Sequence, residues 1–523
     1  MSGMCENKTY DVIVVGGGAA GLAAAISAAW AARGGVAAHG EVPGGEVTDG
    51  EVTADDAAFA RNVAPARLNV AVFEADERVG RSILATGNGR CNFSNAYISP
   101  EVYRNAPFVS EVFAALERVA PWGQGGATGS ATSGENGSEN ASATGGEASG
   151  ENGGANASAT SGEKSGENGS ATSGEASGEN GSANASATGG ENGSQKNAVL
   201  AFFSWLGLMW REEAQGRLFP VTGKASTVLD VLRAAVRALG VQECCNTRVQ
   251  SIEPPRAPGK PYTLRLADGA FARAQAVVCA VGGAVARQLL PDDLAYTAPV
   301  PVLGPLRTET SDIRGLDNIR VRCNVSLERD KAVIARESGE VLFRKYGLSG
   351  IAIFNVSRHA QPGDVVALDL FPALSENQLV EHLFERARAF AAVSGRAATC
   401  EDVLRGMVLP LVAEALCKVF GLKLEDEATP DAIHRIACLA KRFKVKVQGV
   451  GDAKQCQVHR GGFACEGFEA QTLECREYAG LFAAGEMLDV DAPCGGYNLH
   501  WAWSSGMLAG MYAAETCRAK AGE

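Results

Sequence analysis

The sequence predicts an α/β protein in which a Rossmann-like, dinucleotide-binding domain is built from both ends of the chain and interrupted by other segments. Near the N-terminus, an apolar run enters a Gly-x-Gly-x-x-Gly turn and an alanine-rich helix. The C-terminal segment repeats this order of strand, glycine-rich loop and alanine-rich helix. Between them, short alternating segments at about 299–371 predict a β-rich domain, and amphipathic periodicity at 375–442 predicts helices.

The first turn has the chemistry of a pyrophosphate site. Residues 10–29 read YDVIVVGGGAAGLAAAISAA and place glycines at Gly16, Gly18 and Gly21. Gly16 permits the tight turn, Gly18 lets the backbone approach a phosphate, and Gly21 allows the helix to pack closely on the strand. Free N–H groups and the helix dipole favour the anion. An ordinary tight turn is the alternative, but the flanking strand and helix favour a dinucleotide.

The second strand of such a domain ends in an acid that holds the adenosine ribose, usually about 20 residues after the turn. Here the strand at 68–74, LNVAVFE, comes later and ends in Glu74. We interpret the polar, Gly/Pro/Asp/Glu-rich residues 34–67 as an insertion before it. A glutamate at this position indicates an unphosphorylated ribose, as in FAD or NAD.

The length allows two or three domains with a large core, and the apolar content is ordinary for a globular enzyme. The net charge of −12 over 523 residues argues against a generally basic nucleic-acid binder. The 14 cysteines form no CxxC pair, so we expect no metal site and place most of them in the core. Neither a secretory leader nor an apolar run of about 18 residues is present, so we expect a cytoplasmic protein without a membrane partner.

A low-complexity segment at 123–197 repeats variants of SGENGS and ANASATGG. With almost no large apolar side chains it cannot offset its ordering entropy, so it is predicted to be disordered. A repeat expansion in a surface loop is the simpler interpretation. A solubilising or interaction arm is the alternative.

The remaining elements follow in order. Residues 198–209 and 225–239 have helical patterns, the second closed by Gly240, and 247–252 pairs with 262–266 as strands. An apolar strand at 276–281 ends in Gly282 and Gly283, where bare backbone can approach a ligand. The closing unit runs from a strand at 480–484 through a glycine-rich loop to a helix at 499–514. The first turn of that helix would stabilise negative charge on a reduced flavin, although an ordinary βα unit is the alternative.

Several sequence blocks resemble the BaiN/YhiN-type flavoproteins, often called the aminoacetone oxidase family. They are GRSILATGNGRCNFSN at 80–95, GRLFP at 216–220, GEVLF and GLSG at 339–350, and the block at 485–506 that contains GGYNLHWAWSSG. The resemblance covers most of the chain outside the two insertions. It implies an NAD(P)/FAD-dependent oxidoreductase with a glutathione-reductase-like FAD-binding domain, interrupted by a β-barrel-like domain and a small helical domain.

We therefore expect the FAD-binding domain at 1–122, 198–285 and 450–523, with the insertions at 34–67 and 123–197. The β-rich domain is expected at 286–372 and the helical subdomain at 373–449. The resemblance also implies noncovalent FAD bound by residues of both ends of the chain. Together with the glycines of the turn, these are Gly16, Gly18, Ala19, Ala20, Gly21, Glu74, Arg81, Asn88, Gly89, Arg90, Cys91, Asn92, Val249, Gly283, Gly485, Glu486, Asp489, Gly496, Asn498 and Leu499.

Catalytic candidates are Tyr497 and His500, in or beside the loop expected at the flavin ring, and Arg90, which would stabilise an anionic oxygen or the FAD itself. For each of them a structural role is the alternative. Cys91 has no partner in its motif, which favours packing or a flavin contact over a redox role. We expect Glu486 and Asp489 to hold the ribityl chain or the loop rather than to act as an acid.

Two departures from the family pattern bear on the substrate. Ser82 stands where the family usually has lysine, and the loop that follows Ala280 to Gly283 is shortened or replaced. Since that loop would lie near the mouth of the flavin site, substrate choice is the inference it affects most.

The resemblance implies reduction of a carbon–carbon double bond conjugated to a carbonyl, with NAD(P)H as a transient donor because no second Gly-x-Gly-x-x-Gly unit is present. A steroid-like or bile-acid-like small molecule is the first expectation. An rRNA uridine is the second, with the basic cluster at 441–446, KRFKVK, as its compact contact. A flavoprotein oxidase or redox protein of another substrate is the third.

Overall fold

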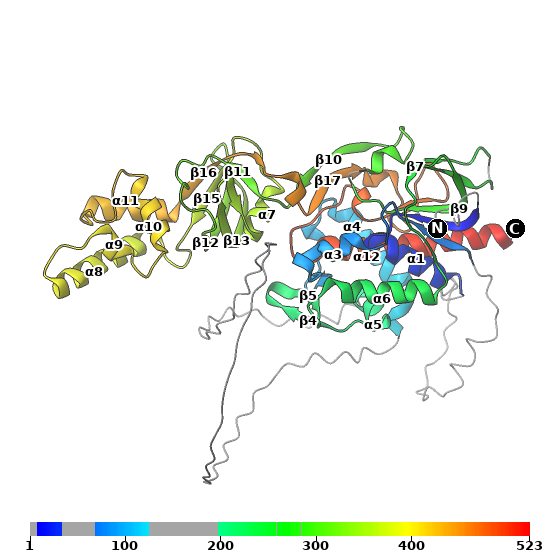
Figure 1. Ribbon diagram of the computed structural model, residues 1–523, viewed down its shortest axis with the longest axis horizontal. Coiled ribbons are helices and arrows are strands. Elements are labelled where there is room, and N and C mark those ends of the chain that lie inside the picture. Colours follow the sequence, from blue (N-terminus) through cyan, green and yellow to red (C-terminus); the bar gives the residue numbers. More distant parts are fainter. Residues whose placement is uncertain (1–7, 34–67, 125–196, 258, 284, 523) are drawn as a thin grey trace, which may run out of the picture. The chain divides into compact units, whose positions relative to one another are not determined.

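The computed structural model describes residues 8–33, 68–124, 197–257, 259–283 and 285–522 (Figure 1). The insertion expected at 34–67, and nearly all of the one expected at 123–197, lies outside these residues. The predicted fold class is confirmed: a Rossmann-type α/β domain is combined with a closed barrel and a group of helices.

A seven-stranded sheet forms the centre of the α/β domain. Its order is β6-β2-β1-β9-β8-β7, and β18 also pairs with β9. Parallel pairing of β1 sets Val12 opposite both Val70 and Ala276. Because these strands are covered on both faces, they are nearly continuous apolar runs. The strands are β1 (Thr9–Val15), β2 (Val70–Phe73), β6 (Gln242–Cys244), β7 (Val249–Glu253), β8 (Tyr262–Leu266), β9 (Phe271–Cys279) and β18 (Leu481–Ala483).

The two ends of the chain meet in a close helix pair. Helix α1 (Ala19–Ala31) packs against α12 (Tyr497–Gly522), which contains the predicted helix at 499–514. A methyl group at Gly506 would lie 2.2 Å from the carbonyl oxygen of Ala20, and one at Gly510 would lie 2.1 Å from that of Ala24. The glycines therefore set how closely α12 approaches the helix that follows the dinucleotide turn.

The other helices of this domain flank the sheet and the site. They are α3 (Arg81–Ala85), α4 (Ala106–Val119), α5 (Ala198–Trp205) and α6 (Ala225–Ala238). As predicted, Gly240 follows α6 in the left-handed conformation, with φ of +71°. A small sheet, β3-β5-β4, joins the block at 80–95 to the GRLFP block. Its strands are β3 (Ser94–Asn95), β4 (Trp210–Glu213) and β5 (Arg217–Pro220).

The β-rich segment forms a closed barrel of order β11-β14-β13-β12-β15-β16. Its strands are β11 (Leu306–Thr308), β12 (Arg320–Arg329), β13 (Ala332–Arg344), β14 (Gly347–Ser349), β15 (Val365–Asp369) and β16 (Phe443–Val450). The short helix α7 (Ile351–Ser357) buries Ala352, Ile353 and Val356 in the barrel core. A separate two-stranded sheet pairs β10 (Tyr296–Val302) with β17 (Val458–Phe463).

Strand β16 departs from the expected boundaries, since we expected residues 373–449 to be the helical subdomain. Instead, residues from 443 onward close the barrel between β15 and β11. The reason is that the helical repeat of apolar residues gives way here to the two-residue alternation of a strand. Phe443, Val445 and Val447 are buried, while Lys444 and Lys446 are exposed. The helices before it are α8 (Glu376–Ser394), α9 (Cys400–Leu404), α10 (Pro410–Lys418) and α11 (Pro430–Lys441).

Within the part of the chain that the structure describes, no helix is both long and apolar enough to cross a bilayer. The same residues contain no group of three or more His, Cys, Asp or Glu side chains placed to hold a metal ion.

Candidate functional site

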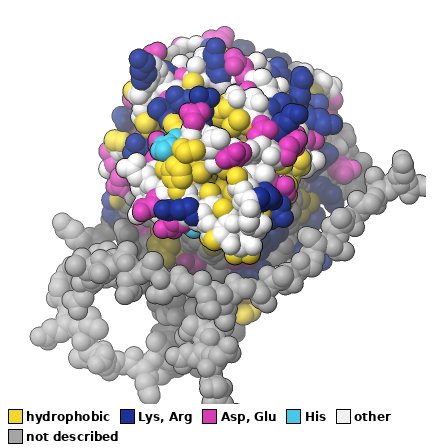
Figure 2. Space-filling model, turned by 90° about the vertical axis from the view of Figure 1, so that its left-hand side faces the viewer, with side chains coloured by type: hydrophobic (Ala, Val, Ile, Leu, Met, Phe, Trp, Pro, Cys, Tyr) yellow, Lys and Arg dark blue, Asp and Glu magenta, His cyan; other side chains and the backbone are white. Residues whose placement is uncertain are grey.

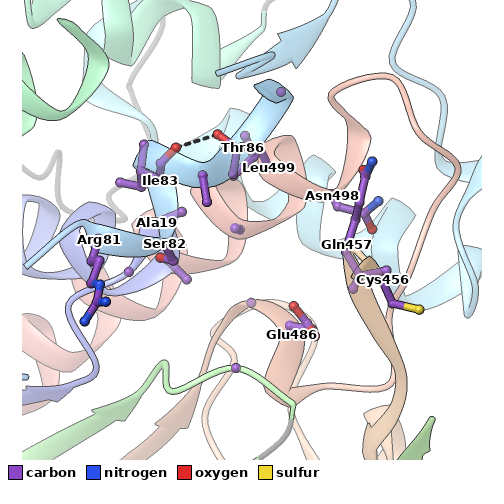
Figure 3. A pocket seen from close by; sticks show the side chains of 18 of the residues that line it. Ala19, Arg81, Ser82, Ile83, Thr86, Cys456, Gln457, Glu486, Asn498 and Leu499 are labelled. Carbon is purple, nitrogen blue, oxygen red and sulfur yellow. Dashed lines mark hydrogen bonds between the residues drawn. The ribbon is translucent and has the colours of Figure 1, made fainter. Parts of the chain in front are cut away.

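A cavity of about 1440 Å³ opens where β1, β2, β9 and β18 end. Ligands of open α/β sheets bind outside the carboxyl ends of the strands, which is this position. Figure 3 shows Ala19, Arg81 and Ser82 on one side of the cavity, with Gln457 and Asn498 on the other and Glu486 below them. The wall thus combines the N-terminal turn, the block at 80–95, the C-terminal loop and the segment before β17.

The glycine turn forms one end of the cavity. Gly16 has φ of +100°, and a methyl group there would lie 2.5 Å from the carbonyl oxygen of Ala280. At Gly21 it would lie 1.8 Å from the carbonyl oxygen of Gly16. At Gly18 the nearest atom would be Ser82 Oγ at 3.3 Å, and no side chain caps the start of α1. The helix N-terminus is therefore open toward the cavity, as a pyrophosphate requires.

Glu74 lies beside the turn, at the end of β2. Its Oε2 accepts a hydrogen bond from Gly17 N at 2.8 Å, and its Oε1 accepts one from Asp76 N at 2.8 Å. Two backbone donors therefore fix the carboxylate at the cavity wall, and its remaining lone pairs are left for the hydroxyls of a ribose.

Replacing Glu74 with Gln is expected to weaken FAD binding about 10- to 100-fold, because an amide NH₂ then faces one of the two backbone N–H groups and a charge-assisted bond is lost. Titration of the flavin-free protein with FAD, followed by flavin fluorescence, measures the dissociation constant. Glu77→Gln, at an exposed position of the same loop, is the matched control. Equal dissociation constants for the two variants would contradict this role of Glu74.

The block at 80–95 supplies polar groups to the cavity. Ser82, Asn88 and Asn92 line it, and Thr86 Oγ1 donates to the carbonyl of Ile83 at 2.7 Å, which fixes the turn after α3 (Figure 3). Asn92 Oδ1 is buried and accepts no hydrogen bond from the residues that the structure describes. A buried acceptor beside the cavity fits a bound group that donates to it.

The C-terminal loop closes the other side. Asn498 pins it, because its Oδ1 accepts from Ala492 N at 2.9 Å and its Nδ2 donates to the Ala492 carbonyl at 2.8 Å. Gly496 has φ of +98°, and a methyl group there would lie 2.2 Å from the carbonyl oxygen of Ser94. The backbone at Gly496 therefore passes close to Ser94 of β3, and Asn498 and Leu499 line the cavity at the start of α12.

Two buried aspartates hold this loop from outside the cavity. Asp489 Oδ1 is 2.8 Å from Arg104 Nε and accepts from Gly461 N at 3.0 Å. Asp491 pairs with Arg358 Nε at 2.7 Å and with Arg460 Nε at 3.0 Å. Burial raises the pKa of Asp491, but the two arginines outweigh it and hold that pKa below its ordinary value.

The cavity brings most of the expected cofactor residues together. Those that line it are Gly16, Gly18, Ala19, Ala20, Glu74, Arg81, Asn88, Arg90, Asn92, Val249, Gly485, Glu486, Gly496, Asn498 and Leu499. Those that do not are Gly21, Gly89, Cys91, Gly283 and Asp489. Cys91 is fully buried, and burial raises its pKa to about 11, so its thiol packs in the core. Gly21 and Gly283 lie behind the wall, and Asp489 holds the loop.

The three catalytic candidates lie in different settings. Arg90 lines the cavity, is ion-paired with Glu213 and lies 4.2 Å from the ring centroid of Phe219. Tyr497 lies outside the lining, and its carbonyl accepts from Tyr103 Oη at 2.9 Å. His500 is buried, with its Nδ1 2.9 Å from Ser94 Oγ. Burial lowers the pKa of His500 to about 3, so the ring is neutral and behind the wall.

Residues of the barrel were not expected in the site. Leu342, Ile351 and Phe354 line the cavity, and so do Arg320 and Glu340, which form an ion pair of 2.7 Å. The sequence signals for this wall were the GEVLF and GLSG blocks, of which Glu340, Leu342, Ser349 and Gly350 line the cavity.

Comparison with known proteins identifies related sequences. Residues 192–512 match the family described as HI0933-like protein Rossmann domain. A 3-dehydro-bile acid delta(4,6)-reductase of Clostridium scindens is 28% identical over 337 residues, covering 60% of this chain and 80% of the relative. A ribosomal RNA dihydrouridine synthase of Escherichia coli is 26% identical over 330 residues, covering 59% and 79%. One of Haemophilus influenzae is 20% identical over 467 residues, covering 85% and 92%.

Proposed function

Because this chain belongs to the HI0933-like family and is an FAD-dependent oxidoreductase, we propose that it reduces a carbon–carbon double bond conjugated to a carbonyl in an apolar small molecule. NAD(P)H would be the transient electron donor. The family resemblance inferred from the sequence blocks is confirmed by the match. The single observation that supports the substrate class is the apolar part of the cavity wall, which the barrel contributes.

That wall is formed by Leu342 of β13 and by Ile351 and Phe354 of α7. Ile351, which lines the cavity, is 46% exposed. Apolar side chains exposed in a concave site favour an apolar ligand, because its binding removes both surfaces from water. The ion pair of Arg320 and Glu340 places polar groups at the same wall. A ring system that bears one carbonyl suits this combination.

When bound, FAD would supply the hydride for such a reduction. We propose that the glycine turn and Glu74 hold the adenosine diphosphate half, and that Asn92, Gly496 and Asn498 hold the flavin half. Arg90, fixed by Glu213 and Phe219, is proposed to stabilise negative charge that develops on the substrate oxygen. Tyr497 and His500, which lie behind the wall, are proposed to position the loop rather than to touch the substrate.

The electron donor is proposed to use the same cavity. Among the described strands, one is followed by a Gly-x-Gly-x-x-Gly turn, namely β1. A nicotinamide would therefore approach the flavin, transfer its hydride and leave before the substrate binds. This order predicts that substrate and nicotinamide compete for one site.

An rRNA substrate is the alternative, since two of the relatives are named as rRNA dihydrouridine synthases. The basic cluster at 441–446 supports it weakly, because most of its charges are neutralised within the chain. The pairs are Lys441 with Asp369, Arg442 with Glu328, and Lys446 with Glu309. On the face that Figure 2 shows, acidic and basic side chains are interspersed rather than gathered into one basic surface. A small molecule is therefore the better-supported substrate.

Anaerobic stopped-flow measurements test the proposal. The purified flavoprotein is reduced with NADH or NADPH, then mixed with a steroid dienone or, separately, with unmodified rRNA. Rapid reoxidation by the dienone is the expected result. Dihydrouridine formed only with rRNA would assign the chain to RNA modification, and slow NAD(P)H oxidation insensitive to any alkene would indicate an oxidase. Purification without flavin would refute the cofactor assignment as well.

A further inference from the structure

We propose that the thiol of Cys494 donates the proton that completes double-bond reduction, and that Asn355, Gln457 and Glu337 position it. This inference rests on the proposed function, since the proton acceptor is the α-carbon of the carbonyl-conjugated double bond.

Cys494 lies where the cofactor loop meets the barrel wall. It lines the cavity and directly precedes Gly495 and Gly496, whose backbone faces the cavity. Cys494 packs against the small apolar cluster of Val302, Leu303 and Val458, and so does Phe354, which lines the apolar wall. A proton donor that adds to a substrate between flavin and barrel must lie at such a junction.

Three segments hold the cysteine in place. Asn355 Oδ1, from α7, accepts from Cys494 N at 2.8 Å, and Asn355 Nδ2 donates to Glu337 Oε2, on β13, at 3.1 Å. The thiol donates to Gln457 Oε1 at 3.6 Å, and Gln457 itself lines the cavity. Cys494 is therefore part of a connected polar network that also contacts the barrel wall.

The surroundings keep the thiol protonated. Burial, and after it the Glu337 carboxylate, raise the pKa of Cys494 to about 12 against the opposing effect of Arg358. Burial also raises the pKa of Glu337. At neutral pH the group is therefore an S–H acid rather than a thiolate nucleophile. The thiol is still a stronger acid than the α C–H group of the carbonyl product, so transfer of the proton from sulfur to the α-carbon is favourable in free energy.

The electrons and protons balance. Bound, reduced FAD would supply the hydride that forms the C–H bond at the β-carbon, and the π pair of the double bond would move onto the α-carbon and carbonyl oxygen. The S–H bond of Cys494 then breaks and its proton forms the C–H bond at the α-carbon. The thiolate recovers a proton from water. The substrate gains two electrons and two hydrogens, and the FAD is oxidised.

Other titratable groups near the loop fit this role less well. His500 and Tyr497 lie outside the cavity lining. Glu486 lines the cavity, but its Oε1 accepts from His459 N at 2.8 Å and is 2.9 Å from His459 Nδ1. Cys456 also lines the cavity, but it lies in the segment before β17 and not in the loop that carries Gly495 and Gly496.

The first test separates the two half-reactions of the holoenzyme. In Cys494→Ala, reduction of the flavin by NAD(P)H is expected to keep its wild-type rate, whereas reoxidation by the enone slows about 10²- to 10⁴-fold. Cys494→Ser should be intermediate or slow, because a hydroxyl is a weaker acid than a thiol. Cys438→Ala, at an exposed position of α11, is the control and should match the wild type. Wild-type reoxidation in Cys494→Ala would overturn the inference alone. Failure of the wild type with every enone would overturn the proposed function, and this inference with it.

The second test needs no turnover. Alkylation of Cys494 by iodoacetamide, followed by peptide mass spectrometry in flavin-free and flavin-loaded protein, reports thiolate formation against pH. Labelling is expected only at strongly alkaline pH, and a bound enone should slow it. In Glu337→Gln the loss of a like charge should move both this labelling curve and the alkaline limb of reoxidation to lower pH. Labelling of Cys494 at pH 7 as fast as that of exposed Cys438, or no shift in Glu337→Gln, would overturn the inference.

Discussion

Replacing Gly21 with alanine is expected to abolish FAD retention and to lower the free energy of unfolding by about 3 kcal/mol, the upper part of the range for overpacking a tight core. A methyl group at this position would lie 1.8 Å from the carbonyl oxygen of Gly16. Neither side can yield freely. Gly16 is itself held against Ala280, and α1 is held by its close contact with α12 at Gly506. The added methyl group must therefore displace the turn that would bind the pyrophosphate.

Two measurements check this expectation: the ratio of flavin to protein absorbance after purification, and the urea midpoint of unfolding. Gly467→Ala is the matched control, because no atom lies within 4 Å of a methyl group there. That variant should keep its flavin and its stability. Gly21→Ala protein that retains stoichiometric FAD with a wild-type midpoint would contradict the assigned packing role and show that the turn tolerates displacement.

The dinucleotide half of the site could be predicted from the sequence because its determinants are local. The strand–turn–helix of β1 and α1 lies within one short segment, and Glu74 ends a strand whose partner is the same β1. The chain order and the turn chemistry alone therefore place these groups together, even across an insertion. The same holds for β18 and the loop before α12.

The barrel wall and the closing strand could not be predicted in this way. Leu306 of β11 pairs with Val450 of β16, and the helices α8 to α11 intervene in the sequence. No local pattern specifies such a pairing, and the alternating residues from Phe443 continue directly from a helix. Ile351 and Phe354 reach the cavity only because the barrel places α7 there, so their functional position depends on tertiary structure.

The orientation of α12 about its axis explains why Tyr497 and His500 lie outside the cavity. Tyr497 and His500 were predicted in or beside the loop, but α12 begins at Tyr497 and both lie in its first turn. The neighbouring Asn498, Leu499, Trp501 and Ala502 line the cavity. Residues three apart share a helix face. The Tyr497 ring meets the Tyr103 ring edge-on, with centroids 6.2 Å apart, and His500 Nδ1 lies 2.9 Å from Ser94 Oγ, so both side chains pack outside the cavity lining. The sequence placed them next to the site, but the face that meets the cavity depends on how α12 packs on α1.

Replacing Asp491 with Asn is expected to lower the free energy of unfolding by about 3–5 kcal/mol, the usual cost of removing one partner of a buried ion pair. The Asp491 side chain is 1% exposed, and those of Arg358 and Arg460 are 9% and 21% exposed. Without the carboxylate, two guanidinium groups from different segments would face each other with no neutralising charge between them. The loop that carries Cys494, Gly495 and Gly496 would lose one of its two attachments to the barrel, the other being the bond from Cys494 N to Asn355, so weaker FAD binding should accompany the loss of stability.

The pKa of Asp491 also predicts how the stability lost in Asp491→Asn should change with pH. Since the folded pKa of Asp491 lies below its ordinary value, the carboxylate stabilises the fold fully above the unfolded pKa of about 3.9. That stabilisation is lost as the pH falls through the lower, folded pKa. The gap in unfolding free energy between wild type and Asp491→Asn should therefore be constant above about pH 5 and shrink below about pH 4. Urea unfolding across this pH range measures the gap.

The control is Asp431→Asn, which removes the exposed pair of Asp431 with Arg435 on α11 and should lower the free energy of unfolding by only about 0.3–0.5 kcal/mol. A gap as small as that control, or one that persists unchanged at pH 3, would mean that the arginines do not depend on Asp491.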